Sequence, residues 1–305
     1  MATLKGQNLR ILAQGLDGTS FAVIGMATNC TITLTNNTDE ASTKDDVGLA
    51  SKPGVISKAW SVQVDSLNVV NAAAMLTAFK AMNKIQVMWD ETSPSDNQTN
   101  GNATFGRQGY AFLSDCTFTF NDRDNSVKSL QLTGASPLTT IPGSGQSYDI
   151  LDPGTYTRGQ FVRLFLGSDN TATPAKVIGS AKQLQLHVSL QMEDASTKDT
   201  TGDWQSQEPT GLSYDITTNA LVRGGDTITS QVQAQGLSEL EAIYEAGTPV
   251  KFQIANVSGA NQRTKGAVIV SGSVILSQLT INAPNRQNAS YDAQLTGWGP
   301  YTVSA

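Results

Sequence analysis

The chain has 305 residues and a formal net charge of −6, and only 15% of its residues are charged. It contains no run of three Lys or Arg residues, so it lacks the basic surface that binding to nucleic acid or to an anionic membrane requires. No apolar stretch approaches the length of a membrane span, and the first ten residues do not form a secretion signal. We therefore expect a protein that is made in a cytosol and either stays there or leaves by lysis.

The sequence is internally repeated. The block Ala-Ser-Thr-Lys-Asp at 41–45 returns at 195–199, a spacing of 195 − 41 = 154 residues. Near the ends of the two halves, Gln-Leu-Thr-Gly at 131–134 returns at 294–297, a spacing of 294 − 131 = 163 residues. The landmarks keep the same order in both halves, which indicates a tandem duplication.

The repeat also predicts where the chain divides. Each half is long enough to bury a core of its own, so we predict a first domain at 1–137 and a second domain at 159–305. The segment between them, 138–158, is rich in Gly and Pro turn signals and is predicted to be the linker.

Short runs of alternating apolar and polar residues predict half-buried strands in both halves. The runs lie at 30–35, 60–65, 85–89, 110–120 and 128–132, and then at 184–190, 250–254, 267–281 and 291–295. The alternation changes phase at Leu113-Ser114-Asp115, which predicts a bulge or a bend between sheets. We place the corresponding break of the second half at Gly272.

One helix in each half, at 71–82 and 237–246, interrupts the strands. Each helix collects its large apolar side chains on one face. These side chains are Met75, Leu76, Phe79 and Met82 in the first helix and Leu240, Ile243 and Tyr244 in the second. The predicted fold class is therefore mainly β, with two tandem β-sandwich or barrel domains, each with one flanking helix and a long extended loop.

Two long polar segments, 36–58 and 192–210, contain the repeated block. Loops of this length are uncommon in compact domains unless they have a function. The same block is kept in both halves while the apolar residues differ, which favours a role in interaction over a disordered surface loop. The residues expected to contact neighbouring subunits are Ser42, Thr43, Lys44, Asp45, Ser196, Thr197, Lys198 and Asp199.

The sequence offers no catalytic constellation. Its single histidine, His187, falls on the polar side of a strand, where a lone histidine is more often a solvated side chain than a base or a metal ligand. The acidic turn at 122–125 has no carboxylates in its second-half counterpart, so a hairpin turn is favoured over a calcium site. We expect no enzymatic activity, no cofactor and no metal. Cys30 and Cys116 lie in the first half only, so we expect buried free thiols rather than a disulfide.

A β-rich domain with one helix and a long loop carrying Ala-Ser-Thr-Lys-Asp-x-x-Gly resembles the major tail tube proteins of long-tailed bacteriophages. The second copy is the closer match, because Asp-Thr-Thr-Gly-Asp-Trp at 199–204 is similar to that family's Lys-Asp-x-x-Gly-x-Trp loop. The first copy has Ala50 where the second has Trp204. The resemblance implies that Trp204 takes part in the loop contacts, that the loop reaches an adjacent ring, and that stacked rings form a hollow tube.

The same resemblance implies a structural protein of a virion tail, made in the cytoplasm of the bacterial host. Its partners would be itself and the tape-measure, tail terminator and baseplate proteins, while DNA passes through the bore without specific binding. Relatives of this kind mostly have one domain per chain in sixfold rings, so two domains in series imply a ring of three chains with pseudo-sixfold order. The residues expected to face the lumen are Thr31, Thr33, Thr35, Gln183, Gln185, His187 and Ser189.

Two other interpretations stay open. The domain could form the tube of a contractile injection machine, a tail terminator or a baseplate ring. A protein of a different class, a monomeric carbohydrate-binding β-sandwich, would need an exposed row of Trp or Tyr side chains. Trp60 and Trp89 fall within strands, and Trp204 and Trp298 lie in unrelated loops, which disfavours that class.

Overall fold

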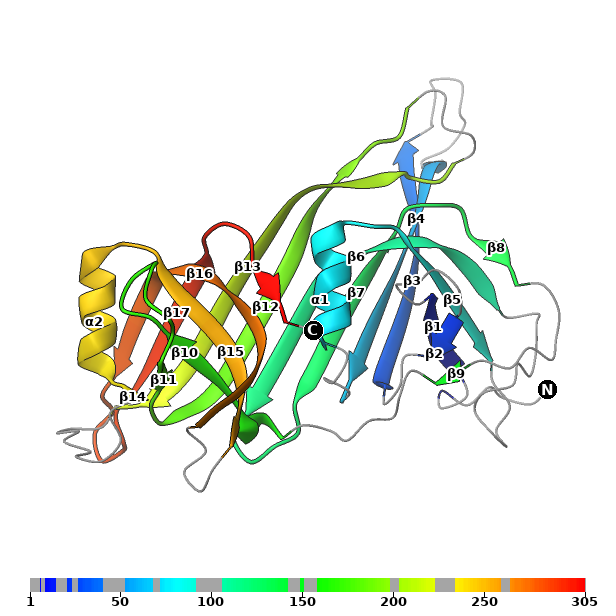
Figure 1. Ribbon diagram of the computed structural model, residues 1–305. Coiled ribbons are helices and arrows are strands. Elements are labelled where there is room, and N and C mark those ends of the chain that lie inside the picture. The colour runs from blue at the N-terminus through cyan, green and yellow to red at the C-terminus, as the bar shows by residue number, and fades with distance from the viewer. Residues whose placement is uncertain are drawn as a thin grey trace.

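The computed structural model places most of the residues that it describes in β-strands, as predicted (Figure 1). The residues that it describes are 6, 9–14, 21–23, 27–40, 53–67, 72–91, 106–141, 149–150, 158–197, 203–222, 234–258 and 264–304. The elements of the first half are β1 (Leu9–Gln14), β2 (Phe21–Val23), β3 (Ala27–Glu40), β4 (Pro53–Ser66), α1 (Ala72–Ala81), β5 (Ile85–Glu91), β6 (Arg107–Asn121), β7 (Val127–Gly134), β8 (Thr139–Thr140) and β9 (Asp149–Ile150). Those of the second half are η2 (Gly159–Phe161), β10 (Val162–Leu166), β11 (Lys176–Ile178), β12 (Ala181–Asp194), β13 (Gln207–Leu221), β14 (Ala234–Gln235), α2 (Leu237–Ala246), β15 (Val250–Ser258), β16 (Thr264–Asn282), β17 (Ser290–Gly297) and β18 (Thr302–Val303).

The two halves repeat one order of elements. In each half two short strands precede a long hairpin, β3–β4 or β12–β13, which is followed by a helix and then by three antiparallel strands. The register is repeated as well, because Ile32 lies opposite Val62 and Leu186 lies opposite Ile216, each 154 residues further along the chain. The domain boundaries at 137 and 159 stay a prediction.

The main layer is an antiparallel sheet of eight strands that runs through both halves. Its strand order is β3-β4-β7-β6-β12-β13-β17-β16. At its centre β6 pairs with β12, with residues 115–121 of the first half opposite 183–189 of the second. Figure 1 shows these strands side by side, so backbone hydrogen bonds join the halves in the middle of the sheet.

A second layer covers one face of this sheet in each half. It contains β1, β2 and β5 in the first half and β10, β11 and β15 in the second. The long strands β6 and β16 belong to both layers, and each changes register between them, at Leu113/Asp115 and at Leu276/Gln278. The predicted bulge near Ser114 is thus confirmed, whereas the predicted break at Gly272 is wrong. Gly272 instead makes room for the ring of Phe252, which a Cβ would approach to 2.9 Å.

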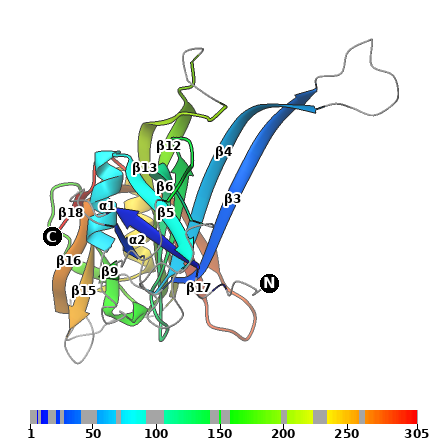
Figure 2. The same cartoon turned by 90° about the vertical axis from the view of Figure 1, so that its right-hand side faces the viewer.

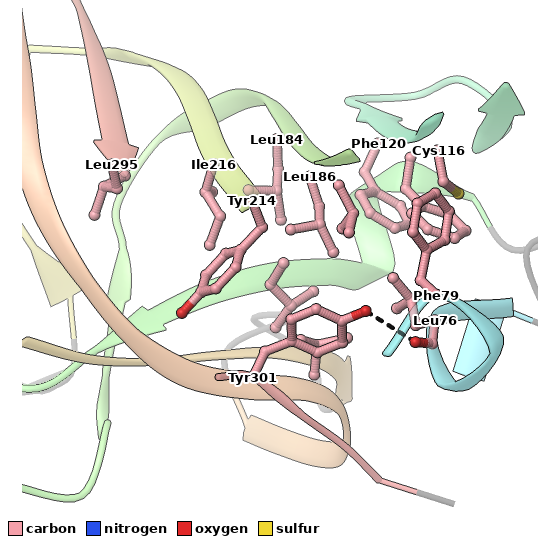
Figure 3. Packing of buried hydrophobic residues seen from close by; sticks show 14 of the residues in the cluster. Leu76, Phe79, Cys116, Phe120, Leu184, Leu186, Tyr214, Ile216, Leu295 and Tyr301 are labelled. Carbon is pink, nitrogen blue, oxygen red and sulfur yellow. Dashed lines mark hydrogen bonds between the residues drawn. The ribbon is translucent and has the colours of Figure 1, made fainter. Parts of the chain in front are cut away.

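One apolar core extends across the boundary between the halves. The buried side chains of β6, among them Phe120, pack with those of β12, among them Leu186 (Figure 3). Tyr301, in the last segment of the chain, donates a hydrogen bond from its hydroxyl to the carbonyl oxygen of Leu76 in α1 over 2.8 Å. The C-terminal end of the second half is therefore fixed to the helix of the first.

The helices lie where the sequence places them, at Ala72–Ala81 and Leu237–Ala246. Leu240 and Ile243 are buried in α2, but Tyr244 is 52% exposed, so the prediction for Tyr244 is wrong. Its position lies about 100° around the helix from Ile243, outside the face that meets the sheet. No helix in the described part of the chain is long and apolar enough to cross a membrane.

Both long hairpins extend past the body of the molecule, most clearly β3–β4 in Figure 2. The segments 36–58 and 192–210, predicted as loops, are partly strand, because β3 runs to Glu40 and β4 starts at Pro53 while β12 and β13 reach Asp194 and Gln207. Their backbone groups pair along the hairpin ladders without a core beneath them. The expected contact residues Ser42, Thr43, Lys44, Asp45, Lys198 and Asp199 lie outside the described residues.

Candidate assembly interface

The pairing of β6 with β12, called here the internal junction, covers Asp115–Asn121 and Gln183–Ser189. On the core side, Phe118 lies opposite Leu186 and Cys116 opposite Val188, and all four side chains are at most 3% exposed. Burial raises the pKa of the Cys116 thiol far above its ordinary value, so this side chain acts as a neutral apolar group. The strands of the junction are continuously paired, and the apolar side chains on its core side are buried.

On the polar side of the internal junction, His187 lies between two carboxylates. Its Nδ1 is 2.8 Å from Asp215 Oδ1 in β13, and its Nε2 is 2.6 Å from Asp115 Oδ2 in β6. A protonated imidazole donates through both nitrogens, so one ring can bind both carboxylates at once. The three side chains, each about one-third exposed, link the two halves beside the backbone ladder.

The carboxylates favour the charged form of this histidine. Partial desolvation acts to lower the pKa of His187, but the hydrogen bonds and charges of Asp115 and Asp215 outweigh it and raise the pKa above its ordinary value. The expectation that His187 lies on the polar face is confirmed, but it is a bridging side chain rather than a freely solvated one. Sequence reasoning missed this bridge, because Asp115 is 72 residues away and nothing in the sequence pairs β6 with β12.

The two outer strands of the eight-stranded sheet end in open edges. In the described part of the chain, β3 pairs only with β4, and residues 278–282 of β16 pair only with β17. Large apolar side chains are exposed at both edges, with Leu34 in β3 64% exposed and Ile281 in β16 49% exposed. An edge with unpaired backbone groups and exposed apolar side chains readily pairs with another strand.

The residues expected to face a lumen lie on the face of the sheet that points away from the core. Thr31, Thr33 and Thr35 are exposed on β3, and His187 and its neighbours on β12 alternate with buried residues. Other side chains of this face hydrogen-bond to one another, as Ser129 does to Asp65 over 2.7 Å. The set therefore forms one polar surface.

The β3–β4 and β12–β13 hairpins, called here the two arms, contact each other where residues beyond the last ladder pair of β12–β13, Asp194 opposite Gln207, meet β4. The Lys58 ammonium lies 3.3 Å from Asp203 Oδ2, and the backbone of Lys58 forms an isolated bridge with Trp204. Trp204, expected to contact another subunit, thus lies partly buried against the first half of its own chain. Ser196 accepts a hydrogen bond from the backbone N–H of Ser206 through its hydroxyl, over 2.9 Å, which extends the pairing of the second arm past this last ladder pair.

The chain enters the second half through a tightly packed glycine. The backbone N–H of Gly159 donates to the carbonyl oxygen of Asp124 over 2.9 Å, in the turn after β6. A Cβ at Gly159 would lie 2.3 Å from the oxygen and 2.4 Å from the nitrogen of Asn121. Only a residue without a side chain fits against the end of β6, so Gly159 forms part of the internal junction.

Comparison with known proteins gives structural likenesses only. No protein-family model and no curated protein matches the chain. Among solved structures, the tail of an empty gene transfer agent particle with C6 symmetry is 17% identical, with a TM-score of 0.38, over 49% of this chain and 99% of that one. A native gene transfer agent virion is 15% identical over 49% and 99%, with a TM-score of 0.36, and the SPP1 tail tube is 14% identical over 48% and 78%, with a TM-score of 0.35.

Proposed function

We propose that this chain is a major tail tube subunit of the phage-tail type, a structural protein that assembles with copies of itself into stacked rings around a bore for DNA. The observation that carries the proposal is the eight-stranded sheet. It consists of two equivalent four-strand units, β3-β4-β7-β6 and β12-β13-β17-β16, joined where β6 pairs with β12. Its two open edges are β3, which corresponds to β12, and β16, which corresponds to β6. A sheet built in this way can be continued by further copies until it closes on itself.

Three chains per ring fit a bore that admits DNA. Three copies supply three times eight, or 24, strands, and at about 4.8 Å between strands and a tilt of about 40° these close at a backbone diameter of roughly 48 Å. Two copies would close at roughly 32 Å, and side chains reaching about 5 Å inward from each wall would leave little more than the width of a duplex. This estimate supports a threefold ring with pseudo-sixfold order over a ring of two chains.

The polar face of the sheet would line the bore. Over its paired strands this face contains the carboxylates Asp65, Asp115, Asp215 and Asp292 among Thr, Ser, Asn and Gln side chains. Carboxylates and small neutral groups repel or ignore DNA phosphates, so a duplex could slide without binding. Thr31, Thr33, Thr35 and the polar residues of β12 would belong to this lining.

The arms would connect one ring to the next. They extend past the sheet, and each ends in a copy of the Ser-Thr-Lys-Asp block, whose opposite charges suit contact with a neighbour. Further partners would be the proteins at the two ends of the tube, terminator and baseplate, and a tape measure within it. The site of action would be the tail of a virion assembled in the host cytoplasm.

Electron microscopy of the purified protein tests the proposal. We expect hollow tubes or rings, and native mass measurement of isolated rings should give three chains. A protein that stays monomeric at high concentration would contradict the proposed function, and rings of six chains would contradict the threefold arrangement. Changing Lys198 and Asp199 together to Ala should leave rings that no longer stack.

A further inference from the structure

We infer that the internal junction is a copy of the contact between chains, so that β16 of one chain pairs with β3 of the next in a register that the structure already contains. This inference rests on the proposed function and specifies its ring contact residue by residue. The partner is a second copy of this chain, placed head to tail.

The equivalence of strands follows from their register. β3 and β4 correspond to β12 and β13 with a shift of 186 − 32 = 154, since Ile32 lies opposite Val62 and Leu186 opposite Ile216. β6 and β7 correspond to β16 and β17 with a shift of 276 − 113 = 163, since Leu113 lies opposite Leu132 and Leu276 opposite Leu295. The bulges at Leu113/Asp115 and Leu276/Gln278 agree with the same shift. The internal junction joins β6 to β12, so its equivalent joins β16 to β3.

Applying these shifts to the internal junction gives the register between chains. Leu186 opposite Phe118 becomes Ile32 opposite Ile281. The pairs on either side become Leu34 opposite Leu279 and Cys30 opposite Ala283, and on the polar face Thr33 lies opposite Thr280 and Thr31 opposite Asn282. Every apolar residue of one edge then meets an apolar residue of the other.

The core-side residues of the internal junction are buried, whereas their equivalents on β3 and β16 are partly or largely exposed, as expected if a second chain covers them. Leu186 is 3% and Phe118 is 1% exposed, whereas their equivalents Ile32 and Ile281 are partly and about half exposed. Leu34, equivalent to the fully buried Val188, is 64% exposed. A second chain in this register would cover them as β6 and β12 cover each other.

The space around Gly6 supports the contact between chains independently. Gly6 and Arg10 correspond to Gly159 and Arg163 with a shift of 159 − 6 = 153, and β1 and β10 pair with their neighbours accordingly. Gly159 has no room for a side chain because the backbone of Asn121 touches it, but a Cβ on Gly6 would meet none of the described residues within 4 Å. The residue equivalent to Asn121 is Pro284, after β16. We place its backbone, from the preceding chain, against Gly6.

The two kinds of junction differ on their polar side. The equivalents of His187, Asp115 and Asp215 are Thr33, Gln278 and Ser61, so the charged bridge of the internal junction has a neutral counterpart between chains. Contact between chains would then depend on the backbone ladder and the apolar side chains.

Cysteine pairing in assembled protein tests the register. In a Cys30→Ala background, with Cys116 left buried, Thr33→Cys and Thr280→Cys should oxidise to a disulfide between chains. The control combines Asn29→Cys with the same Thr280→Cys, which this register separates by four residues, or about 13 Å along the strand, beyond disulfide reach. We expect the first pair to give covalent trimers, as circular species, and the second to stay monomeric on a non-reducing gel.

The outcomes distinguish this inference from the function that it refines. Tubes that cross-link through Asn29→Cys and not through Thr33→Cys would overturn the register and leave the tube function standing. Tubes that cross-link through neither pair would also overturn it. A Cys30→Ala parent that folds but never associates would overturn both.

Discussion

Replacing Gly6 and Gly159 separately by Ala should affect different steps, assembly in the first case and folding of the subunit in the second, although the two glycines occupy equivalent positions. A Cβ at Gly159 would come within 2.4 Å of the Asn121 backbone of the same chain, so Gly159→Ala should destabilise the subunit by about 1–3 kcal/mol, as overpacking does. A Cβ at Gly6 meets none of the residues that the structure describes within 4 Å, so Gly6→Ala should leave the unfolding midpoint of the isolated subunit unchanged.

The effect of Gly6→Ala should appear only on assembly. If the turn after β16 of a preceding chain lies against Gly6 as Asn121 lies against Gly159, the same clash costs about 1–3 kcal/mol per contact, which is roughly a 5- to 150-fold weaker association. Denaturant unfolding of the subunit measures the first quantity, and the lowest concentration at which sedimentation detects tubes measures the second. Gly6→Ala protein that assembles at the parent concentration would refute the reasoning, because no backbone could then lie at that place.

Three further changes test other parts of the structure. Leu34→Asp should leave the subunit folded but block assembly. Each contact would lose the burial of the exposed two-thirds of the leucine side chain, worth roughly 1–2 kcal/mol, and would bury a charge instead. The control Tyr244→Asp, at a similarly exposed site on α2, should assemble normally. His187→Gln should fold and assemble but lose about 1 kcal/mol of pH-dependent stability, a value reduced for partial exposure. Because the pKa of His187 is raised in the folded state, this contribution is full below about pH 6.5 and fades as pH rises through the folded pKa. Unfolding curves of the two proteins should therefore differ at pH 6 and converge at pH 9. Gly134→Ala should lower the melting temperature, with a cost of about 1–3 kcal/mol, because its Cβ would lie 2.4 Å from the buried ring of Trp60; an unchanged melting temperature would show that the ring can move aside.

The sequence predicts the local structure well and the long-range pairing poorly. Alternation of apolar and polar residues locates the strands, and the repeat relates β3 to β12, because both signals are local or are copied along the chain. The pairing of β6 with β12 cannot be predicted from the alternation of apolar and polar residues, since strands with this alternation could pair at many different edges. The bridge of His187 depends on that junction and was missed for the same reason. The sequence pattern predicts loops at the arms because the outer parts of their strands lie mostly exposed, so they lack the alternation that burial imposes.

In the proposed ring, the junction of β6 with β12 would also change the kinetics of assembly. The two halves of one chain meet at an effective concentration of the order of millimolar, so this contact forms during folding and does not depend on how much protein the cell contains. A ring of three such chains would need two bimolecular encounters, where six separate domains would need five, and nucleation would then depend less steeply on subunit concentration. The covalent link would further fix the alternation of the two halves around the proposed ring. Each half is therefore free to acquire side chains, such as His187, that suit only one of the two kinds of neighbour.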